Sequence, residues 1–342
     1  MEKPKPSELF SPEQLAAIKN MIAEELAKPR PKEFKMFSGS SHPNLAQKIA
    51  DVLDSPLGKT KPEIFSCGEQ YVALIETVRD KIVFMIQTCR EKDVALDYEQ
   101  LYFMSDAAMN ADSGKRVAVI PHFGYARQDK VHGKREPISA RVIAKNLETN
   151  GVNHVITCQL HSDQIQGFFK IPVDHVKPHE LFADYFRKKE LKDLVVVSTD
   201  AGGVKNCEEF KSHLGAGLAI LHKQRPEHNK SEVTHIEGDV KDKTCIIYDD
   251  MVDTAGSVCN AKDALMSNGA NPDVYLCATH PIFSGHAIKR LKAAKFKEVV
   301  VSDTLPLDPE KQFEGLTQIS VAHLIAEKMA KIIGMPLPSE KK

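Results

Sequence analysis

The sequence predicts an α/β fold in which mostly parallel sheets are flanked by helices, and three observations support this prediction. Short apolar runs recur along the chain, each followed by a polar turn and a helix-like stretch. The runs are rich in β-branched residues and do not alternate with polar ones, as is typical of parallel strands covered on both faces. Several runs also end in an acid or a histidine, where open α/β sheets bind ligands. The runs span residues 81–87, 116–123, 154–161, 193–200, 244–250, 273–280 and 298–303.

The first element expected along the chain is a helix that begins at Ser11. Ser11 is a suitable N-cap, Pro12 suits the first turn, and Gln14 completes a capping box. Prolines at positions 29 and 31, with charged residues around them, indicate a linker after this helix. We therefore expect residues 1–35 to form an N-terminal helical extension.

The strand ends that carry chemistry are expected to meet at one polar ligand site. They are His161, Asp200, Asp249 with Asp250, His280 and Asp303. The carboxyl ends of parallel strands lie at the same edge of a sheet, which brings such side chains together. An alternative stays open, because acids in these loops also serve as helix N-caps.

Two βα segments, residues 195–206 and 245–260, resemble each other. Each runs from a strand through an acid and a glycine-containing loop into a helix. The similarity fits either a duplicated domain or the shared pattern of βα units.

Composition excludes several classes of protein. The chain has 342 residues, and its net charge of −1 provides no bulk field toward nucleic acid or membranes. No apolar run of membrane-spanning length occurs, and the N-terminus lacks a secretory apolar region. The cysteines number seven, mostly within apolar segments and without a C-x-x-C motif, which suits free thiols in a reducing compartment. We therefore expect a cytoplasmic protein that binds neither nucleic acid nor membranes.

The segment YDDMVDTAGS, residues 248–257, combines a strand end with acids and small residues. A tight loop leading into a helix leaves backbone N–H groups that can converge on a phosphate. These N–H groups belong to Thr254, Ala255, Gly256 and Ser257. Asp249 and Asp250 are acceptors suited to two neighbouring hydroxyls of a ribose. The segment therefore predicts a sugar-phosphate site, and the alternative is an acidic cluster that caps the helix.

This loop resembles the ribose-phosphate loop of type I phosphoribosyltransferases. Further segments narrow the resemblance to ribose-phosphate pyrophosphokinases, also called phosphoribosyl pyrophosphate synthetases. These segments are Phe37–Ser41, Phe123–Asp129, Leu160–Phe169, Ser198–Gly203 and Thr279–Gly285. They occur in the family's order and cover roughly residues 36–335.

The resemblance implies a fold and a reaction. It implies two consecutive phosphoribosyltransferase-like domains, over residues 36–178 and 179–335, followed by a tail at 336–342. It also implies a magnesium-dependent ribose-phosphate diphosphokinase that serves nucleotide biosynthesis. In that reaction the anomeric hydroxyl of ribose 5-phosphate attacks the β-phosphorus of ATP, AMP leaves and phosphoribosyl pyrophosphate forms. Such a transfer needs accurate positioning and cations around the moving group.

The resemblance also assigns residues to roles. Lys223 and Arg225 are the catalytic cations, on a flexible polar loop over residues 222–232 that closes over ATP. His161 and Asp200 hold Mg²⁺. Ribose 5-phosphate is bound by Asp249, Asp250, Asp253, Thr254, Ala255, Gly256 and Ser257.

ATP is assigned to two segments of the chain. Its ligands are Phe65, Cys67, Glu69, Arg127, Gln128 and Asp129. Phe65 and Arg127 are expected to stack on the adenine. In the family these two segments come from neighbouring subunits, which implies a dimer-based homo-oligomer such as a hexamer.

Two departures from the family pattern leave a second interpretation open. Cys67 replaces the acid or amide that contacts the adenine amino group, and a thiol is a poor acceptor. Gln159 replaces the acid two residues before His161, which removes a charge beside the metal site. An active synthetase is favoured by the retained cations, metal residues and ribose loop. The alternative is a catalytically weak or inactive family member that acts as a regulatory subunit of active synthetase.

Overall fold

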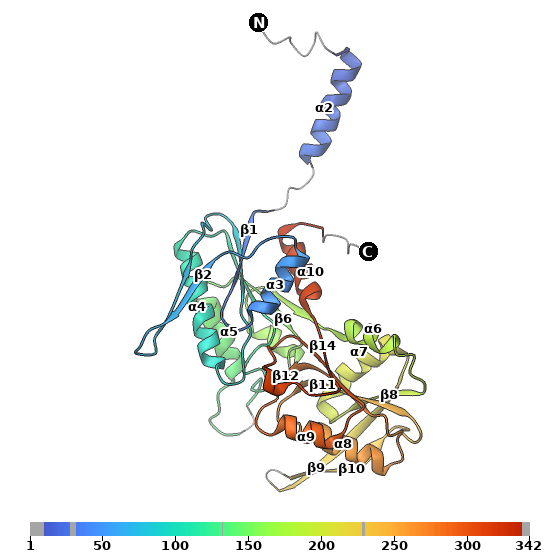
Figure 1. Cartoon of the computed structure of the whole chain (residues 1–342). Coiled ribbons are helices and arrows are strands. Elements are labelled where there is room, and N and C mark those ends of the chain that lie inside the picture. Colours follow the sequence, from blue (N-terminus) through green and yellow to red (C-terminus); the bar gives the residue numbers. More distant parts are fainter. Residues whose placement is uncertain (1–9, 28–31, 132, 228–229, 337–342) are drawn as a thin grey trace.

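The described residues form two large sheets, each placed between helices, and one separate two-stranded sheet (Figure 1). A computed structural model describes residues 10–27, 32–131, 133–227 and 230–336. The α/β class and the pair of phosphoribosyltransferase-like domains predicted from the sequence are confirmed. None of the helices in these ranges combines the length and apolar character needed to cross a membrane.

The first sheet consists of parallel strands only. Its order is β1 (Phe34–Ser38), β4 (Ile82–Ile86), β5 (Lys115–Ile120), β6 (His154–Cys158) and β7 (Val173–Val176). Helices α4 (Val94–Asn110) and α5 (Ser139–Thr149) supply core residues on one face, and α3 (Pro43–Val52) supplies them on the other. We call this unit the first half.

The second sheet is parallel except for one edge strand. Its order is β10 (Lys230–Glu237), β9 (Gly217–Glu227), β8 (Leu194–Ser198), β11 (Thr244–Val252), β12 (Tyr275–Pro281), β13 (Glu298–Ser302) and β14 (Leu316–Ile319), with β10 antiparallel to β9. Helices α8 (Gly256–Ser267) and α9 (Ala287–Ala294) cover one face, and α6 (His179–Arg187) and α7 (Val204–Leu214) cover the other. We call this unit the second half.

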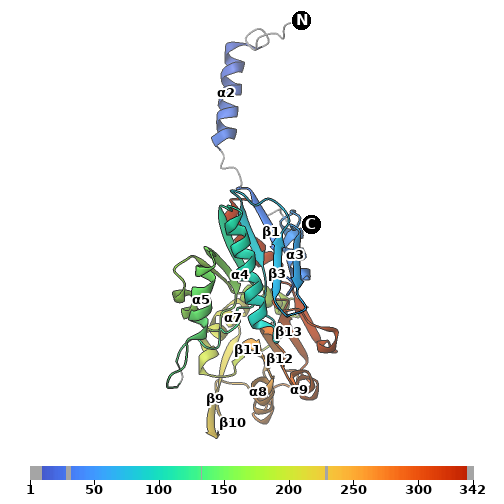
Figure 2. The same ribbon diagram turned by 90° about the vertical axis from the view of Figure 1, so that its left-hand side faces the viewer.

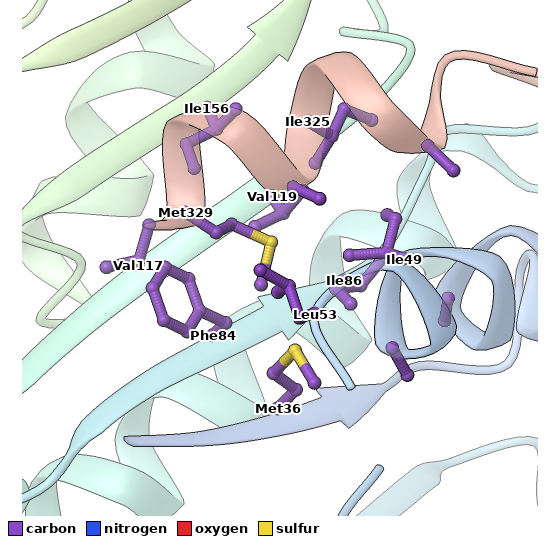
Figure 3. Close-up of a cluster of buried hydrophobic side chains, with 14 of the residues drawn as sticks. Met36, Ile49, Leu53, Phe84, Ile86, Val117, Val119, Ile156, Ile325 and Met329 are labelled. Carbon is purple, nitrogen blue, oxygen red and sulfur yellow. The ribbon is translucent and has the colours of Figure 1, made fainter. Parts of the chain in front are cut away.

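The C-terminal helix α10 (Ala322–Ile333) follows the second sheet but packs on the first. Figure 3 shows Ile325 and Met329 of α10 over Phe84 of the first sheet, beside Ile49 of α3. Buried apolar area of this kind stabilises a fold at about 25 cal/mol per Å². The two halves are thus interlocked, and the predicted division after residue 178 stays a prediction.

Two further elements lie outside the sheets. Strands β2 (Thr60–Ile64) and β3 (Gln70–Leu74) pair as a separate hairpin that packs against α4. Helix α2 (Pro12–Ala27) projects from the body in both views (Figures 1 and 2). The capping box predicted for it is present, because the Ser11 amide donates to Gln14 Oε1 at 2.9 Å and the Gln14 amide to Ser11 Oγ at 3.2 Å.

All the predicted apolar runs overlap a strand, but several strands were missed. The missed strands are β1, β2, β3, β7, β9, β10 and β14. Residues 173–176 and 316–319 read as mixed polar segments, because β7 and β14 lie at sheet edges where burial is incomplete. The two similar segments, 195–206 and 245–260, begin on β8 and β11 of one sheet, so their likeness is that of two βα units.

Candidate active site

One cavity of about 1140 Å³ lies between the two halves and gathers most of the predicted site residues. From the prediction it contains Arg127, Asp129, His161, Asp200, Asp249, Asp250, Asp253, Thr254, Ala255, Gly256 and Ser257. The first two lie on the loop after β5, and His161 lies just beyond β6. The remainder follow β8 or belong to β11, the loop after it and the first turn of α8. Side chains from both sheets therefore face the same space.

The ribose loop has the geometry of an anion-binding turn. Ala255 takes a left-handed conformation, with φ of 60°, and α8 begins directly after it. Within the described chain, the amides of residues 254–257 have no hydrogen-bond acceptor, and no side chain caps this helix. Free N–H groups together with the positive end of the helix dipole favour an anion at this point.

The paired acids of β11 differ in their electrostatics. Burial, strengthened by the charge of Asp250, raises the pKa of Asp249 well above its ordinary value. Burial also favours the neutral form of Asp250, but a contact of 2.8 Å between its Oδ2 and His161 Nδ1 outweighs this effect. The pKa of Asp250 is consequently lowered, and the same hydrogen bond raises the pKa of His161. Asp250 and His161 therefore form a hydrogen-bonded pair that favours the ionised Asp250 carboxylate, while Asp249 favours its neutral form.

Asp249 is held in place by two hydrogen bonds. Its Oδ1 accepts from the Asp250 amide at 2.9 Å, and its Oδ2 accepts from Thr199 Oγ1 at 3.1 Å. A carboxyl group oriented in this way keeps lone pairs for a further donor. Thr199 was not predicted, although its place next to Asp200 in the sequence was a usable signal.

The predicted metal residues fit a magnesium ion only in part. Asp200 Oδ1 accepts from the amides of Gly202 and Gly203, at 2.9 and 3.2 Å. Its second oxygen has no protein partner among the described residues. No group of three or more acidic, histidine or cysteine side chains in the described ranges is arranged to hold a metal. Since Mg²⁺ often keeps water and phosphate oxygens as most of its ligands, Asp200 and His161 suit an ion whose shell the substrate completes.

An ion pair crosses the cavity between an expected ATP residue and an expected ribose residue. Arg127 Nη1 lies 2.7 Å from Asp253 Oδ2, and Ser284 donates its hydroxyl to the other oxygen of Asp253. The Arg127 side chain is 61% exposed, and such pairs contribute about 0.5 kcal/mol. Substrates can therefore separate this pair at little cost.

The other expected ATP residues lie away from this cavity. Phe65, Cys67 and Glu69 occupy the exposed turn of the β2–β3 hairpin, where Phe65 packs on Tyr71 with 6.0 Å between ring centroids. Gln128 receives a hydrogen bond from the hydroxyl of Ser139 instead of lining the cavity. One chain therefore brings together only part of the expected ATP site.

The segment expected to be a flexible loop, residues 222–232, forms paired strands where the structure describes it, at residues 222–227 and 230–232. Strands β9 and β10 pair with each other in this segment. The apolar first residues of β9 pair with β8 in the second sheet, and the strand continues beyond them. The backbones of Lys223 and Arg225 lie in β9, but their side chains lie outside the described residues. Their neighbours Leu221 and His222 line the cavity.

Two predicted strand-end residues do not belong to the cavity, and for them the expectation of one shared ligand site was wrong. His280 is buried between the halves, 2.9 Å from both the Gln159 carbonyl and Thr304 Oγ1, and burial lowers its pKa to about 3. Asp303 Oδ2 binds Lys48 at 2.8 Å. Both side chains join the two halves, because these strand ends face the other sheet.

Gln159 is buried and adopts a positive φ of 30°. In the described part of the protein neither of its side-chain amide atoms has a hydrogen-bond partner, and it does not line the cavity. The expected effect of Gln159 on metal binding therefore stays a prediction, as does that of Cys67 on adenine.

Sequence reasoning missed several residues of the cavity wall. They are Lys130, Ser162, Gln164, Phe168, Thr199, Ala201, Gly202, Gly203, Asn206, Leu221, His222, Tyr248, Met251, Val252 and Val258. Most of them stand next to a predicted residue or inside a quoted family segment, and that adjacency was the available signal. Asn206, one helical turn after Gly203, had no such signal.

Comparison with known proteins shows which family the chain resembles over most of its length. Residues 34–151 match the family described as the N-terminal domain of ribose phosphate pyrophosphokinase, and residues 227–335 match the phosphoribosyl synthetase-associated domain. The chain is 44% identical over 303 residues to a ribose-phosphate pyrophosphokinase of Clostridium acetobutylicum, covering 88% of this chain and 94% of the relative. It is 42% identical over 303 residues to that of Bacillus caldolyticus, covering 89% and 96%.

A solved structure supports the same relationship. The phosphoribosylpyrophosphate synthetase of Mycobacterium smegmatis superimposes with a TM-score of 0.83 at 37% identity, over 89% of this chain and 99% of that one. Sequence and fold agree over nearly the whole length of these relatives, so this chain belongs to the ribose-phosphate pyrophosphokinase family.

Proposed function

We propose that this chain is an active ribose-phosphate pyrophosphokinase, which moves a diphosphoryl group from ATP to the anomeric hydroxyl of ribose 5-phosphate. The products are phosphoribosyl pyrophosphate and AMP. The observation that carries this proposal is the single cavity in which the ribose loop of the second half faces Arg127, Asp129 and His161 of the first. A purely regulatory role has no observation in its favour.

The ribose half of the site follows from the loop after β11. The free amides of residues 254–257 bind the 5-phosphate at the start of α8. Asp249 and Asp250 accept hydrogen bonds from the ribose hydroxyls. With the sugar held at both ends, its anomeric hydroxyl is fixed for attack, which is the main contribution of positioning to such transfers.

The ATP half needs a second subunit in this proposal. Arg127 and Asp129 border the cavity, while Phe65, Cys67 and Glu69 stand on an exposed hairpin away from it. We infer that this hairpin reaches the cavity of a neighbouring copy, which gives a dimer-based homo-oligomer. The exposed aromatic pair Phe65 and Tyr71 supports this arrangement, because exposed apolar side chains often mark an interface.

Magnesium belongs to the proposal, with Asp200 and His161 as its protein ligands. These two side chains would hold the ion, and its charge would offset the negative charge of the ATP phosphate oxygens. Lys223 and Arg225 add cations from β9, next to cavity residues Leu221 and His222. The chain's seven free cysteines suit a reducing compartment, so we assign the enzyme to the cytoplasm.

The proposal is tested by incubating the purified full-length chain with ATP, Mg²⁺ and ribose 5-phosphate and measuring AMP by chromatography. We expect turnover of about 1–100 per second, the range of related phosphoryl transfers. Absence of AMP at saturating substrates, with ribose 5-phosphate still binding in calorimetry, would instead support the regulatory role.

The Lys223→Ala variant tests the cationic contribution. We expect kcat to fall by about a hundredfold or more, because a preorganised charge at the transferring group is lost. The melting temperature should stay the same. Lys241→Ala, which changes an exposed lysine of the same half, is the control and should keep full turnover. Normal turnover of Lys223→Ala would remove this residue from the catalytic machinery.

A further inference from the structure

The ribose loop is fastened along one side by the segment that follows β12. The carbonyl of Val252 accepts from the Phe283 amide at 2.9 Å, and that of Asp253 accepts from the Ser284 amide at 3.0 Å. The next carbonyl, that of Thr254, accepts from Arg290 Nη1 at 2.8 Å. Three consecutive carbonyls are therefore held by one segment, and the last of them by a side chain of α9.

These hydrogen bonds to the loop carbonyls help to fix the orientation of the free amides that follow them. A left-handed conformation is strained for a residue with a side chain, and it persists only where the surroundings hold it. Ala255 has this conformation directly after the carbonyl that Arg290 binds. The amides that follow stay without acceptors in the described chain. Arg290 thus fixes the peptide at which the backbone turns toward the cavity.

Arg290 also places a positive charge at the phosphate end of the loop. Its Nη1 lies 3.7 Å from the position that a Cβ atom would take on Gly256, the first residue of α8. A guanidinium carries several N–H donors, and the Thr254 carbonyl uses only one. The cation therefore stands beside the helix start where an anion is favoured.

We propose that Arg290 is a positioning residue for the phosphate of ribose 5-phosphate. It holds the Thr254 carbonyl so that the loop presents its amides, and its charge adds to the attraction for the phosphate. This inference rests on the proposed function, since it assigns a role within that ribose site. Arg290 acts on binding of the sugar phosphate and not on the transfer step.

The test compares Arg290→Met and Arg290→Lys in the full-length protein. For Arg290→Met we expect the KM for ribose 5-phosphate to rise about tenfold, because a charge-assisted hydrogen bond is lost. The KM for ATP and kcat at saturating sugar phosphate should stay within about twofold. This is the pattern expected when a mutation weakens the ground state and the transition state equally. Arg290→Lys keeps the charge and should recover part of the affinity.

Arg187→Met is the matched control. Arg187 is also an exposed arginine that donates to a backbone carbonyl, that of His213 at 3.1 Å, but this carbonyl belongs to α7 and not to the ribose loop. It should leave both KM values unchanged. An unchanged KM for ribose 5-phosphate in Arg290→Met overturns the inference. So does a joint loss of kcat and of both affinities with a lower melting temperature, or a lysine variant no better than the methionine one.

Calorimetry separates this inference from the proposed function. Binding of ribose 5-phosphate alone requires no turnover, so it reports on Arg290 even if the wild-type chain forms no AMP. Weaker binding by Arg290→Met with no AMP from the wild type would reject the enzyme and keep the positioning role. AMP formation by the wild type with equal binding by both proteins would keep the enzyme and reject the positioning role.

Discussion

The loops after β4 and β11 occupy corresponding places in the two halves. They differ in whether their polar groups are hydrogen-bonded within the protein. Each half contains a strand, a helix and a hairpin in succession, followed by a second parallel strand that pairs beside the first. These elements are β1, α3, β2–β3 and β4 in the first half and β8, α7, β9–β10 and β11 in the second. A long helix, α4 or α8, follows each loop.

The polar groups of the loop after β4 form hydrogen bonds with other groups of the protein. Buried Asp97 accepts the amide of Arg90 at 2.8 Å and its guanidinium Nη2 at 2.7 Å. Thr88 donates to the carbonyl of Thr304 in the other half at 2.7 Å. After β11, by contrast, the amides of residues 254–257 at the cavity have no acceptor among the described residues. The same order of elements therefore gives two different loops. In the first half the polar groups of the loop bond to protein groups, and in the second half the loop amides stay available for a ligand.

The sharpest test of this contrast is to convert an acid beside each loop, Asp249 of β11 and Asp97 of α4, into its amide. Asp249→Asn should weaken binding of ribose 5-phosphate by about tenfold to a hundredfold, because one of the two carboxyl oxygens is replaced by an NH2 group that can only donate. The variant should also gain stability. Since burial raises the pKa of Asp249, ionisation at higher pH disfavours the wild-type fold. The gain should be absent below the unfolded pKa, about 4, and should grow as the pH rises. Calorimetry and thermal unfolding across pH measure both effects.

Asp97→Asn is the counterpart in the first half. Removing one partner of a buried ion pair leaves the other uncompensated, and we expect a loss of about 2 kcal/mol, since Arg90 is partly exposed. The KM for ribose 5-phosphate should not change. Weaker sugar binding by Asp97→Asn, or unaltered binding by Asp249→Asn, would contradict the division between a structural loop and a ligand loop.

Two glycines give a second, smaller test. A Cβ on Gly256 would meet nothing closer than 3.7 Å, so Gly256→Ala should fold normally. The added methyl group would occupy space beside the free amides, and the KM for ribose 5-phosphate should rise about tenfold where a phosphate approaches them. A Cβ on Gly39, in the loop after β1, would lie 2.1 Å from Gln87 Oε1. Gly39→Ala should therefore lower the melting temperature without a specific effect on the sugar phosphate. The reverse pattern would show that Gly256 is needed only for folding.

The sequence predicted those features whose cause is local. Apolar β-branched runs identified the central strands, since both of their faces are buried whatever surrounds them. The loop over residues 249–257 was found because its acids and small residues are adjacent in the chain. The Ser11 capping box was found for the same reason, as its two partners stand three residues apart.

Features that depend on distant contacts were beyond reach of such patterns. The apolar face of α10 predicts burial but does not say against which sheet, and it packs on the first. His280 and Asp303 end strands as His161 does, but they face the opposite half instead of the cavity. The role of Arg290 depends on its meeting Thr254, 36 residues earlier in the chain.

The smallest predicted effect concerns Ser284, which forms a hydrogen bond with the Asp253 side chain of the ribose loop. Its hydroxyl donates to Asp253, whose other oxygen pairs with Arg127 across the cavity. Ser284→Ala should raise the KM for ribose 5-phosphate by about threefold, the value of a single partly exposed hydrogen bond. Ser212→Ala, which removes a hydroxyl bonded to the Glu209 carbonyl at 2.6 Å outside the cavity, should have no effect. If Ser284→Ala binds the sugar phosphate as well as the wild type, Arg127 alone orients Asp253. In that case a residue of the first half, Arg127, holds the Asp253 side chain, and the second half holds only the backbone of the loop.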